Sequence, residues 1–181
     1  MESLKQLLNE GYPLKEEKPT LPYKIYCDMD GVLTDFESRF DHFTGMHPQD
    51  YEREKGKAAF WHLIDGEVGV RFWVGMDWMP EGKRLWNFIA PYKPDLLTSP
   101  SRENQSRLGK NLWVRNNLTP KPKVIFAYSA DKQRYANKNS ILIDDKKSNI
   151  NEWASRGGIA IRCKDGNVDH VINKLQELGY E

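Results

Sequence analysis

Cysteine is scarce in this chain of 181 residues. Its two cysteines, Cys27 and Cys163, lie far apart, and neither belongs to a CxxC motif or a Cys/His cluster. This usage argues against a disulfide framework and a zinc site, and it is typical of a reducing compartment. The four histidines likewise show no spacing suited to metal ligation. We therefore expect a cytoplasmic protein without structural disulfides.

The chain also lacks long apolar runs and an excess of charge of one sign. No stretch is long enough to span a bilayer, and the first residues alternate charged and apolar side chains without a signal-peptide core. Lys and Arg number 27, and Asp and Glu number 26, which gives a net charge of +1. We expect a soluble, unsecreted protein that binds neither membranes nor duplex nucleic acid. Compact anionic substrates remain open, because they need only a local site.

Strand and helix patterns alternate along the second half of the chain. Short apolar runs bounded by turn residues predict strands, and amphipathic segments between them predict helices. This alternation predicts an α/β fold, a Rossmann-like three-layer core with a parallel sheet, in which ligands bind beyond the carboxyl ends of the strands. The predicted strands are 23–27, 95–97, 123–127, 140–143 and 158–162, and the predicted helices are 81–89, 102–116, 147–155 and 168–178.

Two further segments complete the predicted organisation. Residues 1–22 form an N-terminal extension, with an amphipathic helix at 1–9 followed by a charged, proline-bearing linker. Residues 36–90 are helical and aromatic in character, with breaks at Gly and Pro, and we interpret them as an inserted cap subdomain. The core then comprises 23–35 and 91–181. Its helix at 102–116 has Leu108, Leu112 and Trp113 on one face.

The segment DMDGVLTD, which begins at Asp28, follows the first predicted strand. Asp28 and Asp30 are separated by one residue, so their carboxylates can point to the same side, where they repel unless a cation or proton intervenes. A hard cation such as Mg²⁺ suits these oxygen ligands and keeps positions for phosphate and water. The alternative is an acidic turn, since Asp and Gly are common turn residues.

Three later motifs carry compatible chemistry. Thr98 and Ser99 follow the second strand, where hydroxyls and free N–H groups can hold phosphate oxygens, although a simple helix cap would use the same residues. Lys132 offers a compact positive charge, or is one solvated lysine among many. Asp144 and Asp145 end an apolar run, and paired carboxylates there favour a cation over a helix cap.

In this order the four motifs resemble those of the haloacid dehalogenase superfamily. Within it, DMDGVLTDFE, LLTSP, ADK and LIDDK are most similar to the 5′(3′)-deoxyribonucleotidases. The resemblance implies a Mg²⁺-dependent phosphomonoesterase in which Asp28 is the nucleophile that forms an aspartyl-phosphate. Asp30 would protonate the leaving alkoxide and later activate water. The implied metal ligands are the Asp28 carboxylate, the Asp30 backbone carbonyl and Asp145, with Asp144 beside them, and the implied phosphate-binding residues are Thr98, Ser99 and Lys132.

Aromatic residues suggest which phosphomonoester is bound. Phe36 follows the DxDG segment at the position where these nucleotidases stack a ring on the base, and Phe72 and Trp73 precede Pro80 as similar rings do in that family. Stacking is worth about 1–3 kcal/mol per base, although rings of this kind also form cap cores. The resemblance thus implies a (deoxy)nucleoside monophosphate as substrate and leaves a homodimer open.

Two alternatives to nucleotide hydrolysis remain. The first is a phosphatase of the same superfamily that acts on sugar phosphates or polynucleotide ends. The second is a catalytically silent binding module that keeps the fold. A silent site has no need of a costly charge cluster, so the intact acids and lysine disfavour the second.

Overall fold

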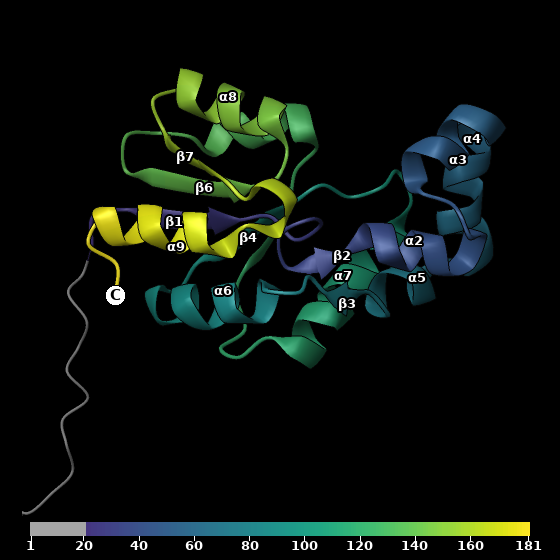
Figure 1. Cartoon of the computed structure of the whole chain (residues 1–181), viewed down its shortest axis with the longest axis horizontal. Coiled ribbons are helices and arrows are strands. Elements are labelled where there is room, and N and C mark those ends of the chain that lie inside the picture. Colours follow the sequence, from purple (N-terminus) through teal and green to yellow (C-terminus); the bar gives the residue numbers. More distant parts are fainter. Residues whose placement is uncertain (1–20) are drawn as a thin grey trace, which may run out of the picture.

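The core of the protein is a five-stranded parallel sheet covered by helices on both faces (Figure 1). The computed structural model describes residues 21–181, so the helix predicted at 1–9 and most of the linker lie outside the described residues. Each predicted strand is present, with ends that differ by at most one residue. The strands are β1 Lys24–Cys27, β4 Asp95–Thr98, β5 Val124–Phe126, β6 Ser140–Asp144 and β7 Ile159–Arg162.

The order of the strands places β1 at the centre of the sheet. The order is β5-β4-β1-β6-β7, and every neighbouring pair is parallel. The chain therefore runs outward from β1 through β4 to β5, then returns to the other side of β1 for β6 and β7. A parallel sheet that reverses its order in this way leaves a crevice at the carboxyl ends beside the central strand, where ligands bind.

The two faces of the sheet are covered by different helices. Alternate residues of β1 point to opposite faces, so Ile25 and Cys27 join a core that includes helices on one side, while Tyr26 packs with Trp153 on the other. Trp153 belongs to α8, and α6 and α9 lie against the opposite face. The helices of the core are α6 Gly82–Ile89, α7 Asn104–Asn117, α8 Lys147–Ser155 and α9 Val168–Glu177, with short 3-10 turns η2 Ala90–Tyr92, η3 Ser129–Tyr135 and η4 Lys164–Gly166.

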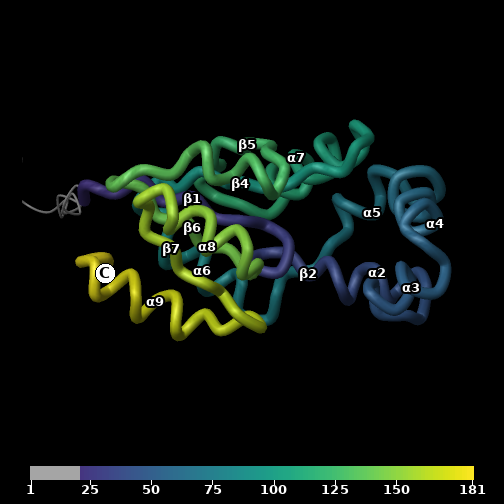
Figure 2. The backbone as a smooth tube through the Cα atoms, turned by 90° about the horizontal axis from the view of Figure 1, so that it is seen from above, coloured from purple at the N-terminus to yellow at the C-terminus, as the bar shows by residue number. Residues whose placement is uncertain are grey.

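A helical cap projects from the carboxyl end of the sheet (Figures 1 and 2). The chain enters and leaves it through an antiparallel pair of short strands, β2 Thr34–Asp35 and β3 Asp77–Trp78. The sequence places 36–90 in the cap, but α6 packs beside α9 on the core, so only the segment before α6 projects. Its helices are α2 Phe36–Thr44, α3 Pro48–Lys55, α4 Lys57–Trp61, the π-helix η1 His62–Val68 and α5 Val70–Val74.

The cap also contacts the core through helix α7 and the segment after β4. Helix α5 packs closely along α7, where Gly109 is needed: a Cβ at this position would lie 2.4 Å from the Cβ of Trp73. Asp65 of η1 is buried and accepts a hydrogen bond of 3.0 Å from the hydroxyl of Ser101, which follows β4. The cap is therefore attached to the core at two places.

Helix α7 presents a different face to the core from the one predicted. Leu108 is 54% exposed, whereas Lys110, Trp113 and Val114 are buried. In a helix of 3.6 residues per turn, the positions that share a face with Trp113 lie three and four residues before it, which selects Gly109 and Lys110 and not Leu108. The prediction for Leu108 was wrong, and the helix instead carries a lysine into the interior.

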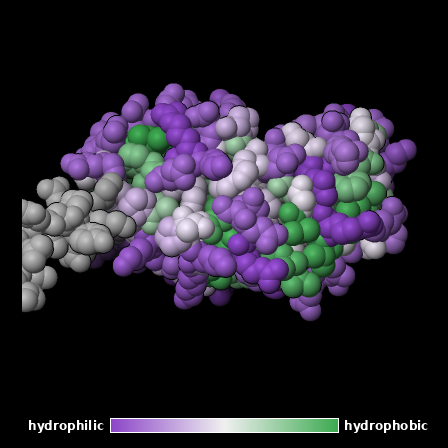
Figure 3. Space-filling model, turned by 90° about the horizontal axis from the view of Figure 1, so that it is seen from below, coloured by the Kyte–Doolittle hydropathy of each residue, from purple (hydrophilic) through white to green (hydrophobic). Residues whose placement is uncertain are grey.

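Hydrophilic residues cover most of the molecular face in Figure 3, and hydrophobic residues gather there in a few patches. Among residues 21–181, no helix combines the length and the apolar character that crossing a membrane would require.

Candidate functional site

The three central strands β4, β1 and β6 end at polar residues that lie side by side. Thr98 ends β4, Asp28 follows β1, and Asp144 ends β6. A cleft of about 1170 Å³ opens between these strand ends and the cap. Asp28, Asp30 and Asp145 line its core side. The topology thus brings together the acids that lie far apart in the sequence.

Asp28 is held in one orientation by contacts to both of its carboxylate oxygens. Its Oδ1 accepts a hydrogen bond of 2.8 Å from the backbone N–H of Met29, and its Oδ2 lies 2.7 Å from Nζ of Lys132. The residue is 7% exposed, yet it lines the cleft. An oriented carboxylate with one accessible side is suited to nucleophilic attack.

Lys132 joins Asp28 to Asp144. It belongs to η3, is 1% exposed, and its Nζ lies 2.7 Å from Asp28 Oδ2 and 2.7 Å from Asp144 Oδ2. Burial lowers the pKa of Lys132, but the two carboxylates outweigh burial and raise it above its usual value. The lysine therefore stays charged and holds Asp28 and Asp144, which come from the ends of two strands, close together.

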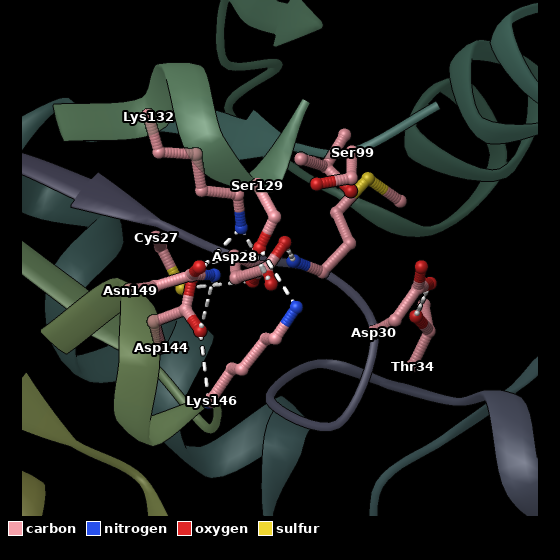
Figure 4. A network of polar contacts seen from close by, with 12 residues as sticks. Cys27, Asp28, Asp30, Thr34, Ser99, Ser129, Lys132, Asp144, Lys146 and Asn149 are labelled. Atoms are coloured by element: carbon pink, nitrogen blue, oxygen red, sulfur yellow. Dashed lines mark hydrogen bonds and ion pairs between the residues drawn. The ribbon is translucent and has the colours of Figure 1, made fainter. Parts of the chain in front are cut away.

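Asp144 accepts hydrogen bonds from several neighbours at the end of β6 (Figure 4). Its Oδ1 accepts hydrogen bonds from the backbone N–H of Lys146 and from Nδ2 of Asn149, and its Oδ2 accepts from Lys132 and again from Asn149. Burial, followed by the charge of Asp28, raises its pKa to about 6, although Lys132 and Asn149 act in the opposite direction. Both of its oxygens are engaged, so Asp144 orients its neighbours.

The surroundings of the Asp145 carboxylate favour a bound cation. Among the described residues, no lysine or arginine nitrogen lies within ion-pair distance of its carboxylate. Burial and then the charges of Asp28 and Asp144 raise its pKa to about 7. Gly31, at φ 76°, makes room for this carboxylate, since a Cβ there would lie 2.6 Å from Asp145 Oδ2. The chain thus leaves an acid unpaired beside Asp28.

Ligand atoms of Asp28, Asp144 and Asp145 all lie within 4.8 Å of one another. Every donor in this group is a carboxylate oxygen, which suits a hard divalent cation such as Mg²⁺ better than a soft metal. A cation there would offset the repulsion that raises the pKa of Asp145. The residues present therefore fit Mg²⁺.

A second buried lysine, Lys110 of α7, contacts Asp30. Its Nζ lies 2.7 Å from Asp30 Oδ2, and it donates hydrogen bonds to Thr98 Oγ1 at 2.9 Å and to the Ser99 carbonyl at 2.8 Å. The other oxygen of Asp30 accepts from the hydroxyl of Thr34 at 3.0 Å. Asp30 and Asp28 are thus held by different lysines.

The three residues expected to bind phosphate, Thr98, Ser99 and Lys132, divide into two groups. Ser99 lines the cleft, whereas Thr98 is fully buried and its hydroxyl accepts the hydrogen bond from Lys110. Lys132 is also almost fully buried and reaches the site through its contacts with Asp28 and Asp144. Only Ser99 of these three lies on the wall of the cleft in its present form.

The predicted aromatic residues also divide. Phe36 is half-buried and lines the cleft, and its ring centroid lies 5.8 Å from that of Trp73, which borders the cleft but is only 2% exposed. Trp61 lines the same wall. Phe72 is fully buried among the cap rings, 5.2 Å from Phe36, and is not part of the cleft wall. The cap therefore presents some of its rings toward the strand ends and keeps Phe72 in its core.

Sequence reasoning missed three residues of this network. Lys110, Ser129 and Asn149 were not predicted, although Asn149 holds Asp144 and accepts a hydrogen bond from the hydroxyl of Ser129. Lys110 had a usable signal: it lies three residues before Trp113 and therefore on the same helix face. Ser129 and Asn149 had none, because polar residues in a turn and a first helical turn are common.

Comparison with known proteins gives structural neighbours only. No family model matches the chain, and no curated protein matches it. Among solved structures, it is similar to a phosphonoacetaldehyde hydrolase-like protein from Oleispira antarctica, with 11% identity and a TM-score of 0.48 over 90% of this chain and 87% of that one.

Two other solved structures are comparably similar. One is D,D-heptose 1,7-bisphosphate phosphatase from Burkholderia thailandensis, with 8% identity and a TM-score of 0.45 over 88% and 87% of the two chains. The other is a magnesium complex of a HAD family enzyme from Bacteroides thetaiotaomicron, with 15% identity and a TM-score of 0.47 over 85% of this chain and 99% of that one.

Proposed function

We propose that the protein is a Mg²⁺-dependent phosphomonoesterase of the haloacid dehalogenase type that forms an aspartyl-phosphate on Asp28. The observation that carries this proposal is the pairing of an oriented, lysine-bound Asp28 with the unpaired Asp145, both on the wall of one cleft. Phosphoryl transfer needs a positioned nucleophile and neutralisation of negative charge, and this pairing supports both.

The residues have separate tasks in the proposed reaction. An oxygen of Asp28 attacks phosphorus as the bond to the leaving oxygen breaks, and Asp30 gives its proton to that oxygen. Water then attacks the phosphorus of the aspartyl-phosphate, Asp30 takes a proton from it, and the bond to Asp28 breaks. Lys132 keeps the Asp28 carboxylate in place and its charge offsets part of the charge on the phosphoryl group.

The bound cation would be held by the carboxylates of Asp28 and Asp145 and the backbone carbonyl of Asp30, with Asp144 beside them. When bound, Mg²⁺ supplies positive charge next to the phosphoryl oxygens. Ser99 lies on the cleft wall, where its hydroxyl can hold a phosphoryl oxygen. Thr98 would act indirectly, because its hydroxyl accepts a hydrogen bond from Lys110.

We infer that the substrate is a nucleoside monophosphate. Two partly exposed rings, Phe36 and Trp61, line the cap side of the cleft. A planar base attached to a phosphate held at Asp28 could lie against these rings, at about 1–3 kcal/mol per stacked base. The volume of about 1170 Å³ is ample for a molecule of this size.

A sugar phosphate is the second candidate, favoured by one observation. Polar side chains of the cap, Glu37, Ser38, Glu52 and Lys57, line the same cleft and can form hydrogen bonds with hydroxyl groups. An acyclic or cyclic polyol phosphate would use them, whereas a base would use the rings.

A phosphate-release screen with and without Mg²⁺ tests both levels of the proposal. The substrates would be nucleoside 5′- and 3′-monophosphates, sugar phosphates and p-nitrophenyl phosphate. Magnesium-dependent release from any of them supports the phosphatase, and full activity in excess chelator would contradict it. Higher kcat/KM for nucleotides than for sugar phosphates supports the nucleotidase.

Two matched phenylalanine variants test the stacking role. Phe36→Ala removes a ring on the cleft wall, and we expect a loss of about 1–3 kcal/mol in kcat/KM for nucleotides with little change for p-nitrophenyl phosphate. Phe43→Ala is the control, because Phe43 lies on the same helix but is 40% exposed and is not part of the cleft wall. Equal losses on all substrates by the Phe36 variant would show that the ring only packs the cap.

A further inference from the structure

Lys110 differs from a surface lysine in its full burial and in the number of its hydrogen bonds. It is fully buried on α7, and Trp113 and Val114, one turn further along the helix, are core residues. A lysine ammonium has three hydrogen-bond donors, and three acceptors lie within 2.9 Å of it: Asp30 Oδ2, Thr98 Oγ1 and the Ser99 carbonyl. Every donor is used, so the position of the nitrogen is fixed.

The three acceptors belong to the two loops that carry the candidate chemistry. Asp30 lies in the loop after β1, and Thr98 and Ser99 lie at the end of β4. The ammonium also lies 5.0 Å from the ring centroid of Trp73, a residue of the cap. Lys110 therefore contacts Asp30 in the loop after β1, the end of β4, and Trp73 of the cap.

The consequence for Asp30 is a fixed carboxylate. Lys110 holds Oδ2 at 2.7 Å, and the hydroxyl of buried Thr34 holds Oδ1 at 3.0 Å. The side chain of Asp30 is nevertheless 27% exposed and lines the cleft. Both oxygens of this carboxylate are therefore held, and the carboxylate faces the cleft. A leaving group can approach it from only a narrow range of directions.

We propose that Lys110 is the positioning residue of the acid/base Asp30. The inference rests on the proposed function. When the bond between phosphorus and the leaving oxygen breaks, the proton of Asp30 passes to that oxygen and Asp30 becomes a carboxylate. The ammonium of Lys110 is already in place to offset this new charge without reorganisation. In the second half of the reaction the same clamped carboxylate accepts the proton of water.

Leaving-group dependence separates a positioning role from a structural one. An alkyl phosphate has a poor leaving group that needs protonation, whereas p-nitrophenolate leaves without it. We expect Lys110→Met, which keeps the length of the side chain, to lower kcat for an alkyl phosphate by about 100-fold, the range of general-acid catalysis. The loss for p-nitrophenyl phosphate should stay within about 10-fold, and KM for both should change little.

A double variant tests whether Lys110 acts through Asp30. The alkyl-phosphate activity of Lys110→Met combined with Asp30→Asn should equal that of Asp30→Asn alone, because the second change removes what the first one positions. Losses that multiply in the double variant would overturn the inference. Val114→Ala on the same helix is the control for stability, since Val114 is a buried core residue that the site does not use.

Thr34→Val gives an independent variant if Lys110→Met does not fold. It removes the other hydrogen bond to Asp30 while it keeps the shape of a buried residue, and we expect the same pattern of a larger loss on the alkyl phosphate. Equal losses on both substrates, in step with a lowered melting temperature as in Val114→Ala, would overturn the role of Lys110 alone. Absence of phosphate release by the unaltered protein from every substrate would instead overturn the proposed function.

Discussion

The unpaired carboxylate of Asp145 gives a prediction that can be measured without turnover. Its pKa is raised from the ordinary 3.8 to about 7, first by burial and then by the charges of Asp28 and Asp144. Between these two pH values the folded protein keeps a proton on Asp145, whereas the unfolded chain has lost it. Because the folded state binds more protons in this window, the free energy of unfolding of the metal-free protein should fall as pH rises through it.

The expected size follows from the two pKa values. Each pKa unit corresponds to about 1.4 kcal/mol, so the full decline is up to about 4 kcal/mol between about pH 4 and pH 7. Asp145→Asn removes the titrating group and keeps the shape of the side chain. At pH 8 without metal, this variant should be more stable than the unaltered protein by up to that amount, and at pH 4 the two should be alike.

Urea unfolding at pH 4, 6 and 8, with chelator or with Mg²⁺, measures this effect. At pH 8 Mg²⁺ at 100 times its Kd should restore about 2.7 kcal/mol to the unaltered protein and much less to Asp145→Asn. Asp169→Asn is the control, because it makes the same charge change at a side chain that is 74% exposed on α9. Parallel pH slopes for the unaltered protein and Asp145→Asn would refute this account of the acid cluster.

Three further predictions concern the proposed nucleophile, the proposed metal-binding loop and the core. Asp28→Asn should abolish Mg²⁺-dependent phosphate release, because the amide cannot form an aspartyl-phosphate, and substantial turnover in the same assay would contradict this. Gly31→Ala places a Cβ 2.6 Å from the Asp145 carboxylate at φ 76°, so it should weaken Mg²⁺ binding in a calorimetric titration, whereas the exposed Gly45→Ala, with open space around it, should not. Leu85→Ala in α6 removes a fully buried side chain and should cost about 2–5 kcal/mol in urea unfolding with KM unchanged; a raised KM would show that α6 also shapes the cleft.

The core of the fold could be predicted from the sequence because its signals are local. Each strand is a short apolar run bounded by turn residues, and the strand ends are marked by Asp28, Thr98 and Asp144. Once the strands are taken as parallel, these residues must lie at one edge of the sheet. The proximity of the acids therefore followed from the topology alone.

The cap and the inner contacts of the site could not be predicted in the same way. A ring in a core and a ring on a cleft wall are the same residue type, so Phe36 and Phe72 differ only in the fold. Lys110 is buried because α7 turns its lysine inward and Leu108 outward, a choice decided by the packing of Trp113 and Gly109. The β2–β3 pair has only two residues in each strand, too few for any pattern.

The two attachments of the cap determine how substrates can enter. A lid joined by the β2–β3 pair alone could swing about it, but in this cap α5 also packs on α7 and Asp65 accepts a hydrogen bond from Ser101. A swing of the cap about the β2–β3 pair would have to break these contacts. We therefore expect the cleft entrance to have the same width before and after the substrate binds. Substrates would then be selected by size at the entrance, and product release would not require the cap to open.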